Sequence, residues 1–473
     1  MTLQKNSKQC YQILIYLQNL VRIALRLQKN FAGKMNQRNL KTYIMRFQTQ
    51  VTEKIKSLFN NGFLKNIFVL LKGVTISQLI SLASLPIITR YFTPTEFGYI
   101  AVYLGIAKVL ATISTGRYEL AIMLPKNNSN AMIVSVISAI FVMITAIIST
   151  IIVLLFSEPI AGFFNINDVT YLLYFLPLSI IFFGLNQTAY HWSSRNKNFS
   201  YLANTRVIQS SSTSLLNILF GFLNFGTPGL LSGNLSGQFF SSFYLVKKWI
   251  KDIQSVKEDI TKKVLLKELI DYKNFPYFSM PMGFLNSISG NLLIYVFSIF
   301  FSAKLVGFYS HAFRVLNYPL NFITSSFTSV FYQRLNVTNN KLKLYTYSYF
   351  SSLIISTVIL IPVIFWGDLL FAFVFGVEWT EAGKIAGIIT PLAITSFAMR
   401  NVSDVFSATR KNEILLGWQS FYLVSGLFVI FLFKDQSINL LLHFFTFVGS
   451  VLYTVLAYVG YRILKNNSGK NND

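Results

Sequence analysis

Eight charged side chains lie inside long apolar stretches of this 473-residue sequence, where they could contact an ionic ligand. Six are basic and two are acidic, namely Lys72, Lys108, Arg117, Arg314, Lys384, Arg400, Glu119 and Asp404. Each charge at the centre of a bilayer costs about 2.5–3.5 kcal/mol on insertion scales, so helices that carry several must turn them toward protein or water. The excess of positive charge predicts an interior that holds an anion such as a phosphate, a carboxylate or a pyrophosphate.

The positions of the basic residues rank them as candidates for binding. Arg117, Lys108 and Arg314 lie several residues from the ends of their apolar stretches, which favours a place inside a cavity. Lys72 and Lys384 lie near the ends, where a long side chain can reach the membrane interface while its stem stays in the apolar layer. For these two lysines, an interfacial position is the simpler interpretation.

The two acids leave more than one interpretation open. Arg400 and Asp404 are four residues apart on one predicted helix face, so they can serve binding or simply neutralise each other. Glu119 lies two residues after Arg117. Both acids are candidates for binding a coupling H⁺ or Na⁺, but an internal ion pair with the neighbouring arginine is a simpler role.

Polar residues at helical spacing accompany Arg314. Asn317 and Asn321 follow it by three and seven residues, which places all three near one face of a helix. Their amide groups offer the hydrogen bonds that sugar hydroxyls need. A second stripe, on the first predicted membrane helix, consists of Ser77, Ser81 and Ser84. Small hydroxyl residues in membrane helices more often mediate helix packing than line a pathway.

The sequence lacks the motifs of the common enzyme classes. It has no P-loop and no dinucleotide-binding fingerprint, and no paired carboxylates or histidine cluster in the loops expected outside the cytoplasm. One cysteine, Cys10, and three histidines argue against a metal centre. We therefore expect no enzymatic activity, and no metal or organic cofactor beyond a coupling ion.

The composition predicts an all-α polytopic membrane protein. The chain is 53% hydrophobic and 12% charged, whereas a soluble domain has roughly 25% charged residues. Its apolar runs are long enough to cross the roughly 30 Å hydrocarbon layer as helices. Twelve are predicted, at residues 66–90, 97–124, 131–156, 169–192, 203–225, 228–249, 276–301, 305–332, 345–366, 382–406, 412–433 and 437–462.

The basic residues outside these runs predict the topology. The net charge of +24 is concentrated in both tails and in alternate loops. This distribution is typical of the cytoplasmic segments of a membrane protein, so we expect no nucleic-acid partner. Both termini are therefore predicted to be cytoplasmic.

The same pattern divides the chain into five segments. They are a basic extension (1–65), a six-helix lobe (66–249), a cytoplasmic linker (250–275), a second six-helix lobe (276–463) and a tail (464–473). A short repeat relates the lobes, because Phe92-Thr93 and Gly98 recur as Phe301-Ser302 and Gly307 at a constant offset of 209 residues. Parallel repeats of this kind are related by an axis along the membrane normal and enclose a central cavity.

Four strings in the sequence resemble those of one family. They are PIITRYFTPTEFGYIAVYLGI (86–106), RYELAIMLP (117–125), FPYFSMPMGFLNSISG (275–290) and VGFYSHAFRVLNYPLNFI (306–323). They are similar to the first hairpin and the seventh and eighth helices of the bacterial lipopolysaccharide, O-antigen and capsule flippases, in the multidrug/oligosaccharidyl-lipid/polysaccharide exporter superfamily. The resemblance covers roughly residues 62–465, and Asp404 matches no motif of that family.

The resemblance implies an inner-membrane flippase for an undecaprenyl-pyrophosphate-linked oligosaccharide. It makes Arg117 and Glu119 motif residues and Arg314 the cavity arginine. From the charges in the apolar stretches, we expect Lys108 and Arg400 to be further contacts for the anion. The implied partners are the lipid-linked oligosaccharide, membrane lipids, a polysaccharide polymerase and a chain-length regulator. Two alternatives stay open, an exporter of cationic drugs and a membrane glycosyltransferase or polymerase. The positive interior argues against the first, and the short external loops argue against the second.

Overall fold

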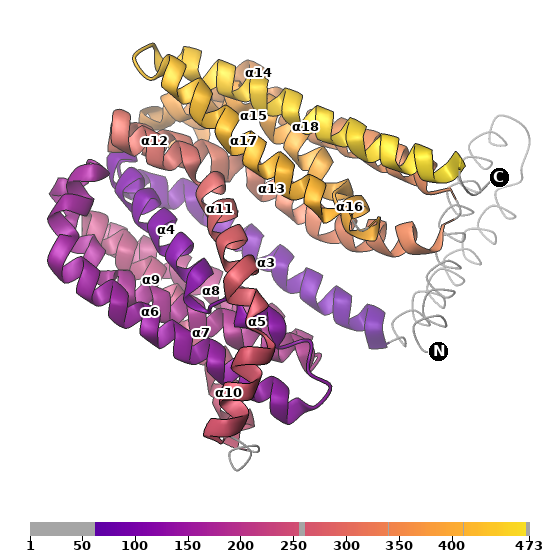
Figure 1. The fold of residues 1–473 in the computed structure, drawn as a ribbon. Helices are drawn as coiled ribbons and strands as arrows, with labels where there is room; N and C mark the ends of the chain where they lie inside the picture. Colours follow the sequence, from indigo (N-terminus) through magenta and orange to yellow (C-terminus); the bar gives the residue numbers. More distant parts are fainter. Residues whose placement is uncertain (1–61, 255–260, 339, 410, 470–473) are drawn as a thin grey trace, which may run out of the picture.

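The computed structural model describes residues 62–254, 261–338, 340–409 and 411–469, almost entirely as helices (Figure 1). The predicted extension, residues 1–65, lies almost wholly outside the described residues. The first half consists of α3 (Gly62–Tyr91), α4 (Pro94–Ser114), α5 (Tyr118–Ala121), α6 (Asn128–Phe163), η1 (Asn167–Phe175), α7 (Leu176–Arg195), α8 (Phe199–Phe222) and α9 (Gly226–Gln254).

The second half begins with a short connecting helix. Its elements are α10 (Lys262–Asp271), η3 (Phe275–Ser279), α11 (Met280–Gly290), α12 (Leu292–Phe300), α13 (Ala303–Val337), α14 (Lys341–Phe375), η4 (Val377–Trp379), α15 (Thr380–Val402), α16 (Asp404–Ala408), α17 (Asn412–Phe433) and α18 (Ile438–Gly469). Each of the twelve predicted apolar segments is occupied by helix. The prediction of an all-α membrane protein is confirmed.

Length and hydropathy separate these helices into two groups. Eight helices in the described part are long and apolar enough to cross a membrane, and the pair α11 and α12, bent by 57°, makes a ninth. The long helices α8, α9 and α13 are more polar and do not meet that criterion. They pack against α3, α4 and α15, and α8 packs against α9, so that polar side chains such as Ser210, Asn217 and Gln238 are buried.

Three of the predicted helices are broken. The second ends at Ser114, and Gly116 and Arg117 take the left-handed conformation, with φ of 57° and 60°, before α5 begins. The seventh bends at Asn291, and the tenth breaks at Ser403. These breaks matter for the site because Arg117, Glu119 and Asp404 lie at them and not within continuous helix.

The two halves meet where α4 crosses α13. A methyl group on Gly98 would overlap the carbonyl oxygen of Ala303, and one on Gly307 would overlap that of Pro94. The side chains of Thr93 and Ser302 cap the first turns of α4 and α13, respectively. The repeat seen in the sequence therefore places equivalent caps and equivalent glycines on both sides of one crossing. The boundaries of the two lobes stay a prediction.

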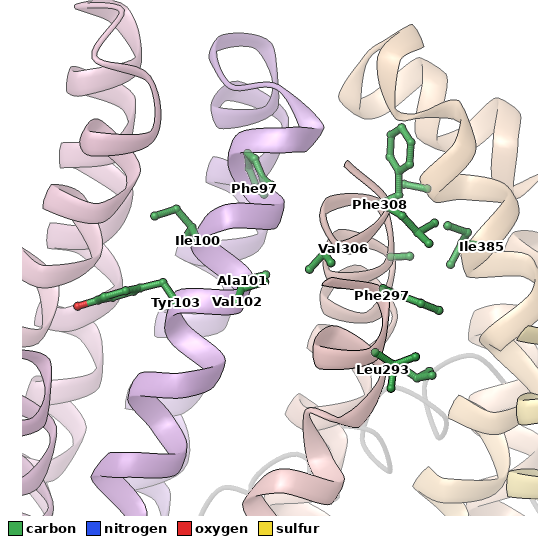
Figure 2. Packing of buried hydrophobic residues seen from close by; sticks show 14 of the residues in the cluster. Phe97, Ile100, Ala101, Val102, Tyr103, Leu293, Phe297, Val306, Phe308 and Ile385 are labelled. Carbon is green, nitrogen blue, oxygen red and sulfur yellow. The ribbon is translucent and has the colours of Figure 1, made fainter. Parts of the chain in front are cut away.

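An apolar cluster extends across this crossing. Figure 2 shows some of its members, which come from α4, α12, α13 and α15 and include Phe97, Val102, Phe297, Val306 and Ile385. In Figure 1, α11 lies between α4 and the group formed by α13–α18, and it contacts both α4 and α17. The boundary between the halves is thus packed at the α4–α13 crossing and bordered by α11.

Candidate functional site

A polar cavity of about 200 Å³ lies beside the α4–α13 crossing. Helices α3, α8 and α9 supply most of its wall, α4 supplies two apolar residues, and α13 supplies an arginine and a tyrosine. The lining residues are Ser81, Ser84, Leu85, Ile88, Phe97, Ile100, Thr213, Ser214, Asn217, Leu230, Asn234, Arg314 and Tyr318. Hydroxyl and amide groups on one side thus face a guanidinium on the other.

Two glycines on α9 let it pack closely against the polar residues of α8 that line the cavity. A side chain at Gly233 would collide with the Asn217 amide, and one at Gly237 would collide with the Thr213 hydroxyl. Small residues four apart let membrane helices approach closely, so α9 and α8 pack tightly here. Asn217 is 6% exposed, and its Oδ1 is buried with no hydrogen-bond partner in the described residues.

The serine stripe of α3 reaches this cavity only in part. Ser84 and Ser214 share a hydrogen bond of 2.8 Å between their hydroxyl oxygens, which joins α3 to α8. Ser81 also lines the cavity, whereas the Ser77 hydroxyl donates to the Val74 carbonyl within its own helix. Ser84 therefore serves both helix packing and the polar lining.

Arg314 brings a positive charge to the cavity from the other half of the molecule. Its side chain is half-buried, and Tyr318, four residues on, shares its face of α13. Among the described residues, Arg314 has no acidic partner within ion-pair distance. Since no carboxylate neutralises it, this guanidinium is available to an anion.

Arg400 has a different environment from Arg314. Its Nη2 donates to the Oδ1 of Asn317 at 3.2 Å, and its Nη1 donates to the Oδ1 of Asn321 at 3.4 Å. The two asparagines therefore bind α15 and do not line the cavity with Arg314. Asp404 forms no ion pair with Arg400.

Arg117 and Glu119 form a third polar cluster, at the break between α4 and α5. The Arg117 Nη1 lies 3.4 Å from the Glu119 Oε1, and Glu119 is fully buried. The Gln187 amide also donates to that oxygen, at 3.3 Å. Gly283 on α11 lets the guanidinium approach, since a Cβ there would lie 3.2 Å from its Nε.

Lys108 lies exposed on α4, apart from the cavity residues. It is one turn before Thr112, whose methyl group faces Gly283, so its side chain is on the α11 side of α4. Lys384 pairs with Glu381 at 2.6 Å, and Lys72 is exposed. No three His, Cys, Asp or Glu side chains in the described ranges come together as a metal site.

The structure thus separates the predicted residues into three places. Arg314 lines the cavity, Arg400 binds Asn317 and Asn321, and Arg117 binds Glu119. Sequence reasoning missed the residues of α8, α9 and α13 that complete the cavity, which are Thr213, Ser214, Asn217, Asn234 and Tyr318. The signal that could have found them is the pairing of Gly233 and Gly237 with polar residues in the preceding helix.

Comparison with known proteins gives both a family and a fold. A family model described as polysaccharide biosynthesis protein matches residues 87–384. The succinoglycan biosynthesis transport protein ExoT of Rhizobium meliloti (strain 1021) is 24% identical over 311 residues, which are 65% of this chain and 61% of that protein. The aligned part of this chain therefore spans less than two thirds of that relative.

Two solved structures share the fold. Lipid II flippase MurJ, in an inward closed conformation, matches with a TM-score of 0.62 at 14% identity, over 85% of this chain and 90% of MurJ. An inward-facing multidrug resistance transporter of the MATE family, in the MOP superfamily, matches with a TM-score of 0.58 at 15% identity, over 85% of this chain and 94% of the transporter.

Proposed function

Because the chain belongs to the polysaccharide biosynthesis protein family, we propose that it is a flippase for undecaprenyl-pyrophosphate-linked oligosaccharide repeat units. It moves each unit from the cytoplasmic to the outer leaflet of the bacterial inner membrane, for O-antigen or capsule synthesis. The transport function named for ExoT and the flippase function named for MurJ support this proposal. The polymerase and the chain-length regulator that use the unit are its proposed partners.

The strongest support for this proposal is that Arg314, which has no acidic partner among the described residues, lines the same cavity as several hydroxyl and amide groups. A lipid-linked oligosaccharide combines a pyrophosphate with sugar hydroxyls. An arginine binds phosphate oxygens through two parallel hydrogen bonds, and the amides of Asn217 and Asn234 can bind hydroxyls. The cavity of about 200 Å³ holds only part of such a substrate, so we assign it the anionic group and the first sugar.

The position of the cavity suits alternating access. Its polar wall belongs to the first half and its arginine to the second, so relative movement of the halves changes the site. We propose that the packed α4–α13 crossing closes one end of the pathway while substrate enters from the other. Arg117 and Lys108, near α11, then lie where an anionic head group enters.

The positive charge in the cavity and its lining residues also bear on the two alternative functions. An exporter of cationic drugs needs an anionic or neutral site, whereas this cavity contains an unpaired cation and no acid among its described lining residues. A polymerase needs catalytic side chains, and the lining contains none arranged as a nucleophile with its base. The transport of an anionic glycolipid remains the function that fits best.

The decisive experiment locates the lipid-linked oligosaccharide in cells that lack this protein. Its accessibility to an impermeant lectin or glycosidase in spheroplasts reports the leaflet. We expect complete units to be trapped in the inner leaflet, and wild-type protein to restore them to the outer leaflet. Single units that reach the outer leaflet but fail to lengthen would instead favour the polymerase.

Substitution of Arg314 then tests the site. Arg314→Ala is expected to stop export at unchanged membrane abundance, because Arg314 forms no ion pair within the part of the chain that the structure describes. Arg314→Lys should have a milder effect. The matched control is Arg206→Ala, an exposed arginine that lies over the Tyr190 ring, which should export normally. Arg400→Ala should instead lower abundance, since it leaves Asn317 and Asn321 without their donor. A loss of abundance in Arg314→Ala would show a structural role.

A further inference from the structure

His311 lies on α13 one turn before Arg314, and it is completely buried. Aromatic rings surround its imidazole. The ring centroids of Trp379 and Phe375 lie 4.4 Å and 4.5 Å from its own, and those of Phe97 and Phe371 lie at 5.8 Å. Neither ring nitrogen has a hydrogen-bond partner in the described part of the chain. A buried polar group with no partner is uncommon in native proteins and calls for an explanation.

The aromatic cage is built from both halves of the molecule. Phe97 comes from α4 in the first half, whereas Phe371 and Phe375 come from α14 and Trp379 from η4 in the second. The Trp379 indole donates to the Thr89 carbonyl of α3, at 3.2 Å, which ties the cage to the first half a second time. The first half therefore closes one side of the cage, and separation of the halves at the α4–α13 crossing removes Phe97 from that side and the Thr89 carbonyl from Trp379.

The charged groups around His311 do not favour an imidazolium. Arg314, three residues on, is a like charge on the same helix. On α4, Glu96 is held by Thr93 in the capping box, and on α14, Asp368 accepts from the Leu369 backbone amide. Glu378, next to Trp379, is exposed. Since burying a charge with neither a counter-ion nor a hydrogen bond is strongly unfavourable, the caged imidazole is neutral.

We propose that His311 is a proton-binding site, neutral while the halves are closed at this crossing and protonated when they separate. The proposal rests on the alternating-access cycle proposed above, because it needs the halves to part there. Separation brings the ring nitrogens to water, where they bind a proton, and closing returns that proton to water. Proton binding only in the open form must shift the equilibrium toward that form as the pH falls.

The test measures the opening of this end in the full-length chain. Cys10 is replaced by serine, and spin labels are attached at Asn167→Cys on η1 and Gln436→Cys between α17 and α18, both exposed. The distance between the labels is measured in lipid nanodiscs between about pH 5 and 8, the range in which imidazole titrates. We expect the ratio of open to closed forms to rise up to tenfold for each pH unit below the pKa of free imidazole, about 6.5.

Variants of the three histidines provide matched controls. His311→Phe keeps a ring in the cage and should abolish the pH dependence of the label distance. His311→Gln, which also cannot titrate, should abolish it too and serves as the second variant in case phenylalanine disturbs the packing. His191→Phe and His443→Phe replace the other two histidines of the chain. In these variants, the distance between the labels should depend on pH as it does in the wild type. A distance that does not change with pH, or that titrates equally in both His311 variants, would overturn the proposal.

Export is measured separately, so that failure of the two proposals can be told apart. If the oligosaccharide crosses the membrane without this protein while the label distance still depends on His311, the flippase function is wrong and the proton site stands. If export depends on the protein but its opening does not depend on His311, the proton site is wrong and the flippase function stands.

Discussion

Three arginines inside the apolar part of the chain have three different electrostatic environments. Arg117 forms an ion pair with a fully buried carboxylate, Arg400 donates to two asparagines, and Arg314 has no acidic partner in the described residues. The same residue type therefore contributes to packing in two places and is free for a ligand in the third. The partner of each arginine, more than its depth, separates a structural role from a binding role.

The Arg117–Glu119 pair gives a prediction at the residue scale. Arg117→Gln leaves the Glu119 carboxylate buried without a counter-charge, so we expect the free energy of unfolding to fall by about 3–5 kcal/mol. Glu119→Gln should cost less, because the Arg117 side chain is 21% exposed and can reach water. Thermal unfolding of the purified proteins measures both effects.

The double variant Arg117→Gln/Glu119→Gln decides what the pair does. Replacing both partners removes the unpaired charge, so we expect stability to return close to that of the wild type. If the two single effects simply add, the pair does not stabilise the fold. If stability returns and export does not, Arg117 also contacts the substrate.

At the scale of the elements, the α4–α13 crossing depends on two glycines and two caps. Thr93 and Ser302 begin the two helices, and Gly98 and Gly307 let the helix backbones touch. A close backbone approach of this kind needs residues without a Cβ. The crossing is therefore the most sensitive contact between the halves to a small increase in side-chain volume.

Gly98→Ala tests that sensitivity. The added methyl group overlaps the Ala303 carbonyl, so the helices must move apart, and we expect a loss of about 1–3 kcal/mol in the free energy of unfolding. Gly417→Ala on α17 is the matched control, because nothing lies within 4 Å of its added Cβ. It should be neutral or stabilising, since alanine favours helix over glycine. Equal effects of the two substitutions would contradict the close crossing.

The connecting helix α10 docks through a buried acid. The Asn130 amide donates to the Glu268 Oε1 at 2.8 Å, and Glu268 is 4% exposed. Burial, and then the nearby charge of Asp271, raise the pKa of Glu268 above its ordinary value of 4.5. Because the docked form binds the proton more tightly than the undocked form, docking is strongest below the ordinary pKa and weakens as the pH rises through the raised one.

Hydrogen exchange of the α10 amides should follow that pH dependence. We expect the protection of α10, corrected for intrinsic exchange, to fall from acidic to neutral pH in the wild type. Glu268→Gln keeps an accepting oxygen but cannot ionise, so its protection should stay high at neutral pH. Glu413→Gln, at an exposed acid, should behave like the wild type. A pH-independent protection in the wild type would contradict the docking role of Glu268.

On the scale of the whole molecule, the start of α3 and the end of α18 lie at the same side in Figure 1. The excess of basic residues in the tails predicts that this side is cytoplasmic. In that predicted orientation, the α4–α13 crossing lies toward the outside, and the Arg117–Glu119 cluster lies toward the cytoplasm. The orientation decides from which side substrate and protons reach the site.

Cysteine labelling in intact cells tests this orientation. In the Cys10→Ser background, Gln436→Cys in the loop after α17 should react with an impermeant maleimide. Lys465→Cys near the end of α18 should react only after the cells are permeabilised. Reaction of Lys465→Cys in intact cells would show that the predicted topology is wrong. The α4–α13 crossing would then face the cytoplasm.

The sequence by itself determined the helices and the excess of positive charge in the apolar regions. Apolar runs of membrane length are a local property, so all twelve segments could be predicted, but the breaks inside three of them were not. The equivalent glycines, Gly98 and Gly307, could also be found as a repeat. The family resemblance is likewise carried by short strings, and the family match confirms it.

Only the tertiary structure decided which charges are free and where the cavity lies. The sequence placed Arg314 with Asn317 and Asn321 on one stripe, but the two asparagines turn to Arg400 on α15, and the cavity is completed by α8 and α9. The aromatic cage of His311 likewise combines residues from both halves. The physical reason is that helical spacing sets which residues share a face, whereas the packing of distant helices sets what that face meets.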